Sequence, residues 1–102
     1  MQDESNIAYF AHNLAAIAQA QGDLDEARSL YQQSFDIKRK LGDQSGIAFT
    51  LGQLGRLAED EGDKAEAARL YREALIIFER LRSPNAEIAR ESLEKVEGRD
   101  EG

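Results

Sequence analysis

The chain has 102 residues, of which 13 are basic and 20 acidic, so its formal net charge is −7 at pH 7. This acidic balance disfavours nucleic acid and anionic membranes as partners, because both bind proteins through basic surfaces. The sequence holds no cysteine and a single histidine, which excludes disulfides, thiolate chemistry and a multi-histidine metal site. Hydrophobic residues make up 41% of the chain, enough for the core of one small domain.

The N-terminal residues 1–6 are polar and acidic, and we expect them to form a tail. They lack the basic start and apolar run of a secretory signal. No segment of the sequence reaches the roughly 20 apolar residues that span a bilayer. The expected location is therefore cytoplasmic.

Apolar residues then recur at three- and four-residue spacing from Ile7 onward, which is the period of an amphipathic helix. The pair Gly22-Asp23 interrupts this pattern, because glycine commonly ends a helix and aspartate caps the start of the next. A second helix is predicted to follow and to stop at Gly42-Asp43.

The second half of the chain repeats this order of elements. A helix is predicted from Ile47 to Glu61, a turn at Gly62-Asp63, and another helix from Ala65 to Arg82. The only proline, Pro84, marks the end of that helix and the start of another. A fifth helix and a polar tail complete the prediction.

An internal repeat with a period of 40 residues underlies this order. Residues 7–46 align with residues 47–86 without a gap, and 12 of the 40 positions are identical. The identical pairs are Ile7/Ile47, Ala8/Ala48, Leu14/Leu54, Ala18/Ala58, Gly22/Gly62, Asp23/Asp63, Glu26/Glu66, Ala27/Ala67, Leu30/Leu70, Tyr31/Tyr71, Ile37/Ile77 and Leu41/Leu81.

A partial third copy begins near Ala86 with one residue deleted, so that Leu93 corresponds to Leu54. The expected organisation is a tail, two repeats, a capping helix and a second tail, at residues 1–6, 7–46, 47–85, 86–97 and 98–102.

These helix pairs resemble the tetratricopeptide repeat family. Its signature places a small residue after leucine in the first helix, and an alanine and an aromatic residue four apart in the second. The matching residues are Leu14-Ala15 with Ala27 and Tyr31, and Leu54-Gly55 with Ala67 and Tyr71. The large aromatic residue that the family has early in the first helix is replaced by Ala11 and Leu51. The period of 40 rather than 34 residues is similar to the long repeats of kinesin light chains and LGN-like proteins.

The resemblance implies an all-α fold: a right-handed α-solenoid of two helical hairpins plus a C-terminal capping helix, five helices in all. Small residues should let the paired helices approach closely, with Gly55 packed against Ala67. In the last helix, Ile88, Leu93 and Val96 are expected to cover the end of the second repeat.

Three features could carry chemistry, and each has a plainer interpretation. His12 lacks a firmly placed serine and carboxylate partner, so a surface or groove contact is favoured over catalysis. The acidic run from Asp60 to Asp63 lacks the ligand order of a calcium loop and is interpreted as favourable charge at a helix start. At Gly52, a groove floor and neutral drift both remain open. We expect no metal and no cofactor.

The resemblance also implies a concave groove lined by the first helix of each pair. In long-repeat members of the family, amides there hold the backbone of an extended peptide, and Asn13 and Gln53 are amides at equivalent positions. The aromatic residues of this face suit apolar side chains, although packing against their own neighbours is an alternative. Its cations suit an acidic group. The predicted groove residues are Tyr9, His12, Asn13, Ala16, Phe49, Gly52, Gln53, Arg56, Ile88, Ser92 and Lys95.

The leading hypothesis is a non-catalytic module that binds a protein or peptide segment in this groove. The alternative is self-association, as a homodimer or an array, through the exposed first helix. Phe10 carries that alternative, because the equivalent residue of the second repeat is the polar Thr50.

Overall fold

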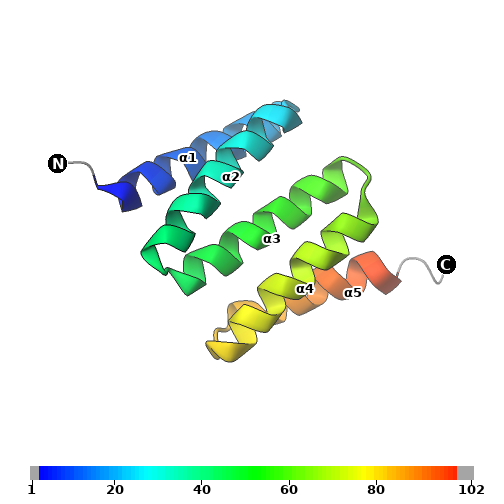
Figure 1. Ribbon diagram of the computed structural model, residues 1–102. Helices are drawn as coiled ribbons and strands as arrows, with labels where there is room; N and C mark the ends of the chain where they lie inside the picture. The colour runs from blue at the N-terminus through cyan, green and yellow to red at the C-terminus, as the bar shows by residue number, and fades with distance from the viewer. Residues whose placement is uncertain (1–2, 99–102) are drawn as a thin grey trace.

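The computed structural model describes residues 3–98, which form five α-helices and no strand (Figure 1). The helices are α1 (Glu4–Ala20), α2 (Leu24–Leu41), α3 (Gln44–Asp60), α4 (Lys64–Arg80) and α5 (Asn85–Gly98). Within these bounds, no helix combines the length and the apolar character that a membrane crossing requires. The predicted all-α fold with five helices is confirmed.

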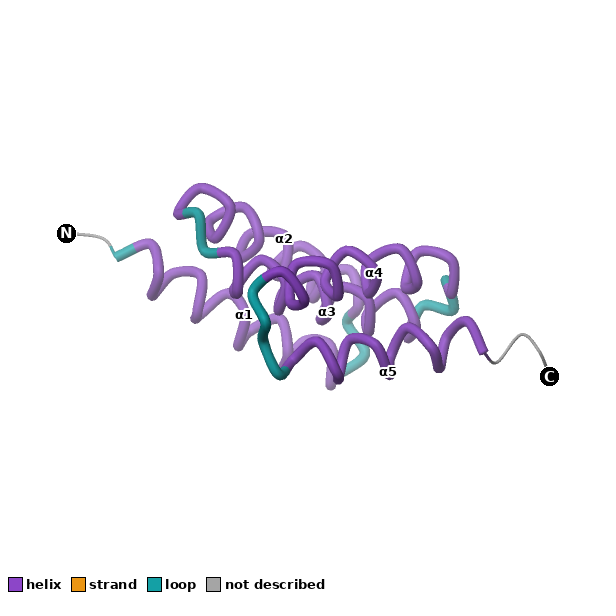
Figure 2. The backbone as a smooth tube through the Cα atoms, turned by 90° about the horizontal axis from the view of Figure 1, so that it is seen from below, coloured by secondary structure: helices purple, strands orange, loops and turns teal. Residues whose placement is uncertain are grey.

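Each helix packs against the next one in the chain, which makes an open stack and not a closed bundle. In Figure 1 the helices follow one another across the molecule, with α1 at one edge and α4 and α5 at the other. The view in Figure 2 places α2 and α4 on one side and α1 and α5 on the other. The stack measures 52 × 33 × 16 Å.

Aspartates at 20-residue intervals start the first four helices. Each accepts a hydrogen bond from a backbone N–H of the first turn, which satisfies one of the free donors of that turn. The four bonds are Asp3 from Ser5 (3.0 Å), Asp23 from Glu26 (3.3 Å), Asp43 from Gly46 (2.9 Å) and Asp63 from Glu66 (3.1 Å). Ser83 takes the fifth position, and its hydroxyl accepts from the N–H of Asn85 at 3.1 Å.

The residue before each of the last four caps adopts a left-handed backbone conformation. Gly22, Gly42 and Gly62 have φ of 84°, 72° and 83°, which glycine tolerates because it has no side chain. Arg82 occupies the fourth such position with φ of 56°, and it is the only non-glycine residue in residues 3–98 with a positive φ.

Small side chains lie between the helices of each hairpin, and Ala15, Ala27 and Ala67 are fully buried. The three atoms nearest to a Cβ placed on Gly55 all belong to the ring of Tyr71, the closest at 2.7 Å. A larger residue at position 55 would therefore collide with the Tyr71 ring. The expected contact of Gly55 with Ala67 stays a prediction.

Two details differ from expectation. Residues 4–6 form the first turn of α1 and not a tail, because Asp3 caps it; residues 1 and 2 and residues 99–102 of the expected tails lie outside the described part of the chain. Ile88 is 62% exposed, whereas Ala89 and Val96 are buried and Leu93 is half-buried. Ala89 therefore takes the covering role that was predicted for Ile88.

Candidate functional site

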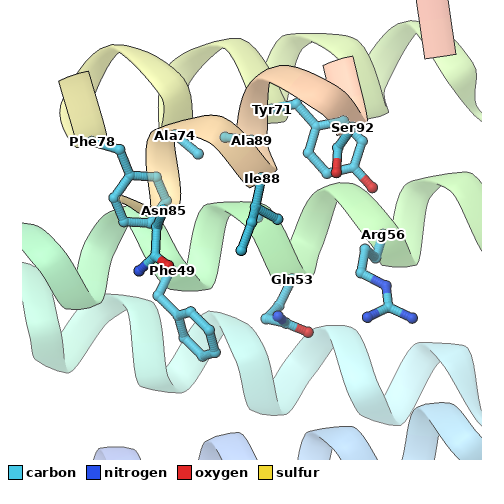
Figure 3. A pocket seen from close by; sticks show the side chains of 11 residues that line it. Phe49, Gln53, Arg56, Tyr71, Ala74, Phe78, Asn85, Ile88, Ala89 and Ser92 are labelled. Atoms are coloured by element: carbon cyan, nitrogen blue, oxygen red, sulfur yellow. The ribbon is translucent and has the colours of Figure 1, made fainter. Parts of the chain in front are cut away.

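A hollow of about 150 Å³ lies between α3, α4 and α5. Figure 3 shows Phe49, Gln53 and Arg56 projecting from α3, with the Ile88 side chain extending from α5 in their direction. The lining residues are Phe49, Gly52, Gln53, Arg56, Tyr71, Ala74, Phe78, Asn85, Ile88, Ala89 and Ser92. The wall is mostly apolar, with amide and guanidinium groups at its edge.

A second hollow adjoins the first and extends the surface over the first hairpin. Its lining residues are Ser5, Tyr9, His12, Asn13, Lys38 and Phe49. Phe49 borders both hollows, so the two adjoin at this residue of α3. We refer to the residues of these two hollows together as the groove.

The groove contains most of the residues that the sequence placed there. Asn13 and Gln53 lie on the same side of the molecule, as two amides along one surface. Ala16 and Lys95 are exposed but line neither hollow. The predicted residues that do line the groove are Tyr9, His12, Asn13, Phe49, Gly52, Gln53, Arg56, Ile88 and Ser92.

His12 forms part of an aromatic wall. Its ring centroid lies 5.5 Å from that of Tyr31 and 5.1 Å from that of Phe49. Burial lowers the pKa of His12, and the nearby Lys38 lowers it further, so the imidazole is neutral at pH 7. Its buried Nδ1 has no hydrogen-bond partner within residues 3–98, whereas a histidine of a catalytic triad is oriented by a carboxylate. The geometry supports a contact role.

Lys38 is the main groove residue that the sequence analysis missed. Its Nζ atom lies 3.4 Å from Thr50 Oγ1 and 5.8 Å from the centroid of the Phe49 ring. Burial lowers the pKa of Lys38 in spite of the opposing effect of Asp43. In the 40-residue alignment Lys38 corresponds to Phe78, which also lines the groove. The alignment shows that the two positions are equivalent, but it does not show that the second helix reaches the groove.

The other missed residues come from the seam between the last two helices. They are Tyr71, Ala74 and Phe78 on α4, and Asn85 and Ala89 on α5; Ser5 on α1 was also missed. The Tyr71 hydroxyl donates a hydrogen bond to Glu59, and the equivalent Tyr31 donates to Gln19 at 2.9 Å. These bonds fix both rings between their helices.

The groove differs in charge from the chain as a whole. None of its lining residues is an aspartate or a glutamate, and two of them, Lys38 and Arg56, are cations. The acidic run that begins at Asp60 has structural partners instead: Asp60 accepts from Gln19 and Glu61 pairs with Arg28. A chain of charge −7 thus presents a cationic concave surface.

Gly52 gives the groove an open floor. A Cβ placed on this residue would have no neighbouring atom within 4 Å, so no packing contact in residues 3–98 requires glycine there. A glycine in the middle of a helix costs about 0.5–1 kcal/mol relative to alanine. The space above it is large enough for the backbone of a ligand to approach.

Stacked helical hairpins with a concave groove define a helical-repeat protein. Residues 6–80 match the sequence model of the tetratricopeptide repeat, and the chain belongs to that family. A search of curated proteins gave no match. Repeats of this family generally mediate protein–protein interactions, and the family is a non-catalytic interaction scaffold. The likeness to kinesin light chains stays a prediction.

Proposed function

We propose that the chain is a non-catalytic module that binds an extended peptide or protein segment in the groove. The observation that carries this proposal is the row of amide, aromatic and cationic side chains across α1 and α3, uninterrupted by a carboxylate. A surface of this kind holds a main chain, apolar side chains and an acidic group at once.

The ligand that fits best is an extended segment with an acidic residue next to an apolar one. Asn13 and Gln53 can both donate to and accept from its main chain, because an amide carries both kinds of group. Phe49 is large and 43% exposed, which suits an apolar side chain of the ligand. Arg56 is exposed and, within residues 3–98, has no ion-pair partner, so it can bind a carboxylate.

The partner under this proposal is a protein or peptide in the cytoplasm, and neither nucleic acid nor a membrane. The cationic groove is small, and the net charge of −7 repels polyanions at long range. An acidic residue within a short peptide has too little charge for this repulsion to prevent binding at physiological salt.

A display library of random peptides tests the proposal directly. We expect the selected peptides to carry aspartate or glutamate beside an apolar residue. The double variant Asn13→Ala/Gln53→Ala should bind them about tenfold more weakly or worse, since each lost hydrogen bond removes about 1 kcal/mol. The variants Gln33→Ala, on the exposed side of α2, and Arg72→Ala, outside the groove, are the matched controls.

Gly52→Ala provides a second arm of the same experiment. It should stabilise the fold by about 0.5–1 kcal/mol, because alanine favours a helix. It should also weaken binding of the selected peptides if their backbone approaches α3. Selected peptides that bind the double variant as tightly as the parent chain would contradict the amide role.

A further inference from the structure

The helices α1, α3 and α5 occupy equivalent places in the repeat, and each carries a row of four equivalent residues. This row is buried or half-buried in α3 and α5 but exposed to solvent in α1. In α3 the row is buried, and its members are Ile47, Thr50, Leu54 and Leu57. In α5 the row is buried or half-buried, and its members are Ala86, Ala89, Leu93 and Val96. In α1 the row is exposed, and its members are Ile7, Phe10, Leu14 and Ile17, which we call the α1 stripe.

The covering element is the second helix of the preceding repeat. Thr50 of the α3 row meets Lys38 of α2, whereas Gly55, on another side of α3, meets Tyr71 of α4. The α5 row is covered in the same way, because α5 packs on α4. No element within residues 3–98 covers the α1 stripe, which therefore has the shape of a helix-packing surface without a partner there. Phe10 at its centre is 63% exposed.

The spacing and the charge of the α1 stripe suit a second copy of the same helix. The four residues recur at intervals of three, four and three, which is the seam of a two-helix contact. No lysine, arginine, aspartate or glutamate occurs between Ser5 and Ala20, so an identical copy meets no like charge. In an antiparallel pair Phe10 would lie opposite Leu14 and Ile7 opposite Ile17, so the stripe is complementary to itself. In this orientation the two helix dipoles run antiparallel, which is favourable, and the two Glu4 carboxylates lie at opposite ends of the helix pair.

The opposite end of the stack does not offer a surface for the stripe. The side of α3 that packs on α4 carries Ala48, Leu51, Gly55 and Ala58, and the corresponding residues of α5 are Glu87, Arg90, Glu94 and Glu97. Arg90 pairs with Glu79 and Glu87, and Glu97 pairs with Arg72. Packing the apolar stripe against this charged face of α5 would remove its charged groups from water, which is unfavourable. Head-to-tail contact between copies is therefore disfavoured, and contact of α1 with α1 remains.

We propose that two copies of this chain associate through their α1 stripes, antiparallel about a twofold axis. Tyr9 and Asn13 lie on another side of α1, so both grooves stay open in the dimer. A helix of 17 residues is about 25 Å long, and one helix pair buries less than a standard interface of about 800 Å² per partner. The dissociation constant should therefore be on the order of 10–100 µM.

Sedimentation equilibrium of the purified chain at about 5–500 µM tests this dimer. The parent should shift from monomer to dimer across this range, and Phe10→Glu should weaken the association at least tenfold, because it buries a charge in the seam. Ala16→Glu is the matched control, since Ala16 is an exposed residue of α1 that belongs neither to the stripe nor to the lining of either hollow, and it should leave the association unchanged. A parent chain that is monomeric throughout, or an Ala16→Glu variant as impaired as Phe10→Glu, would overturn the proposal.

Salt and single cysteines separate this dimer from other assemblies. Two copies of charge −7 repel each other, so raising NaCl from about 50 to about 500 mM should tighten the dimer, whereas an ion-paired contact would weaken. The chain contains no cysteine, so oxidation of a mixture of the Phe10→Cys and Leu14→Cys variants reports the register directly. With equal amounts of the two variants, the mixed disulfide should exceed the two homodisulfides together, because random pairing makes only about half of the product mixed. A mixture dominated by the two homodisulfides would overturn the antiparallel arrangement.

Discussion

Arg82 holds a backbone conformation that the three preceding turns reserve for glycine. A left-handed conformation costs a residue with a side chain roughly 1–2 kcal/mol, and Arg82 has φ of 56°. The turn between α4 and α5 therefore has the most strained backbone of the four turns. The serine cap and the proline mark this turn in the sequence, and the 40-residue alignment pairs Arg82 with Gly42, so the left-handed position at an arginine could be predicted from the repeat.

Replacing Arg82 with glycine should relieve this turn. We expect Arg82→Gly to raise the free energy of unfolding by about 0.5–1 kcal/mol, the native gain exceeding the added flexibility of the unfolded chain. Urea denaturation measures the change. The control Arg80→Gly, at the last residue of α4, should lower the stability, by up to about 1 kcal/mol. Loss of stability in Arg82→Gly would mean that the arginine side chain holds the turn.

Ser34 is fully buried, and its hydroxyl has no hydrogen-bond partner within residues 3–98. The equivalent residue of the second repeat is Ala74, which is also fully buried. Ser34→Ala should therefore stabilise the fold by about 1 kcal/mol, because an unsatisfied buried polar group is removed. Ser29→Ala, at an exposed position of the same helix, measures the helix-propensity contribution alone. Equal effects of the two substitutions in urea denaturation would contradict the prediction.

His12 gives the stability a dependence on pH near neutrality. Its pKa in the folded state lies below the value of about 6.5 in the unfolded chain, so the unfolded state binds more protons between these values. The free energy of unfolding should fall as the pH is lowered from about 7.5 to about 5.5. Glu61 and Glu66 also have lowered pKa values, but they lose their contributions only near and below pH 4.5.

The variant His12→Phe isolates this effect. A phenyl ring retains the contacts with Tyr31 and Phe49 but does not titrate. The difference in unfolding free energy between the two pH values should be smaller in the variant than in the parent. An identical pH dependence in both proteins would show that His12 is not its source.

The helices of this chain can be predicted from short sequence patterns. The 3.6-residue period predicted the helices, the three Gly-Asp pairs predicted the first three turns, and Pro84 predicted the fourth turn. The start of α1 was missed because residues 4–6 are polar, and only the Asp3 cap makes them helical. Ile88 was assigned to the covering face because the deletion in the third copy obscures the register, and the structure assigns that role to Ala89.

The helix α5 should behave as a cap that the rest of the stack requires. Ending the chain after Asn85 exposes Ala74 and Phe78 of α4 to water. We expect the free energy of unfolding to fall by at least about 2 kcal/mol, with a lower melting temperature. Ile88→Ala, at an exposed position of the same helix, should change it by less than about 0.5 kcal/mol. A truncated chain with an unchanged melting temperature would count against the capping role.

Across the whole molecule, the groove could be predicted only in part. The residues of the first helices follow from the repeat alignment, since equivalent positions face the same side. Lys38 and Phe78 could not be found in that way, because whether a second helix reaches the groove depends on the tilt between hairpins. The same holds for the ring of Tyr71 across Gly55. Tertiary geometry of this kind leaves no periodic trace in the sequence.

The even spacing of the aspartate caps also makes the chain a modular building unit. A block from Leu24 to Asp63 contains one second helix, one first helix and the turns that end both. A copy of this block inserted directly after Asp63 would preserve the interval between caps and the phase of every helix. Such an insertion would add one further lysine, phenylalanine, glutamine and arginine to the concave surface. The longer surface could bind ligands that exceed the length of the present groove.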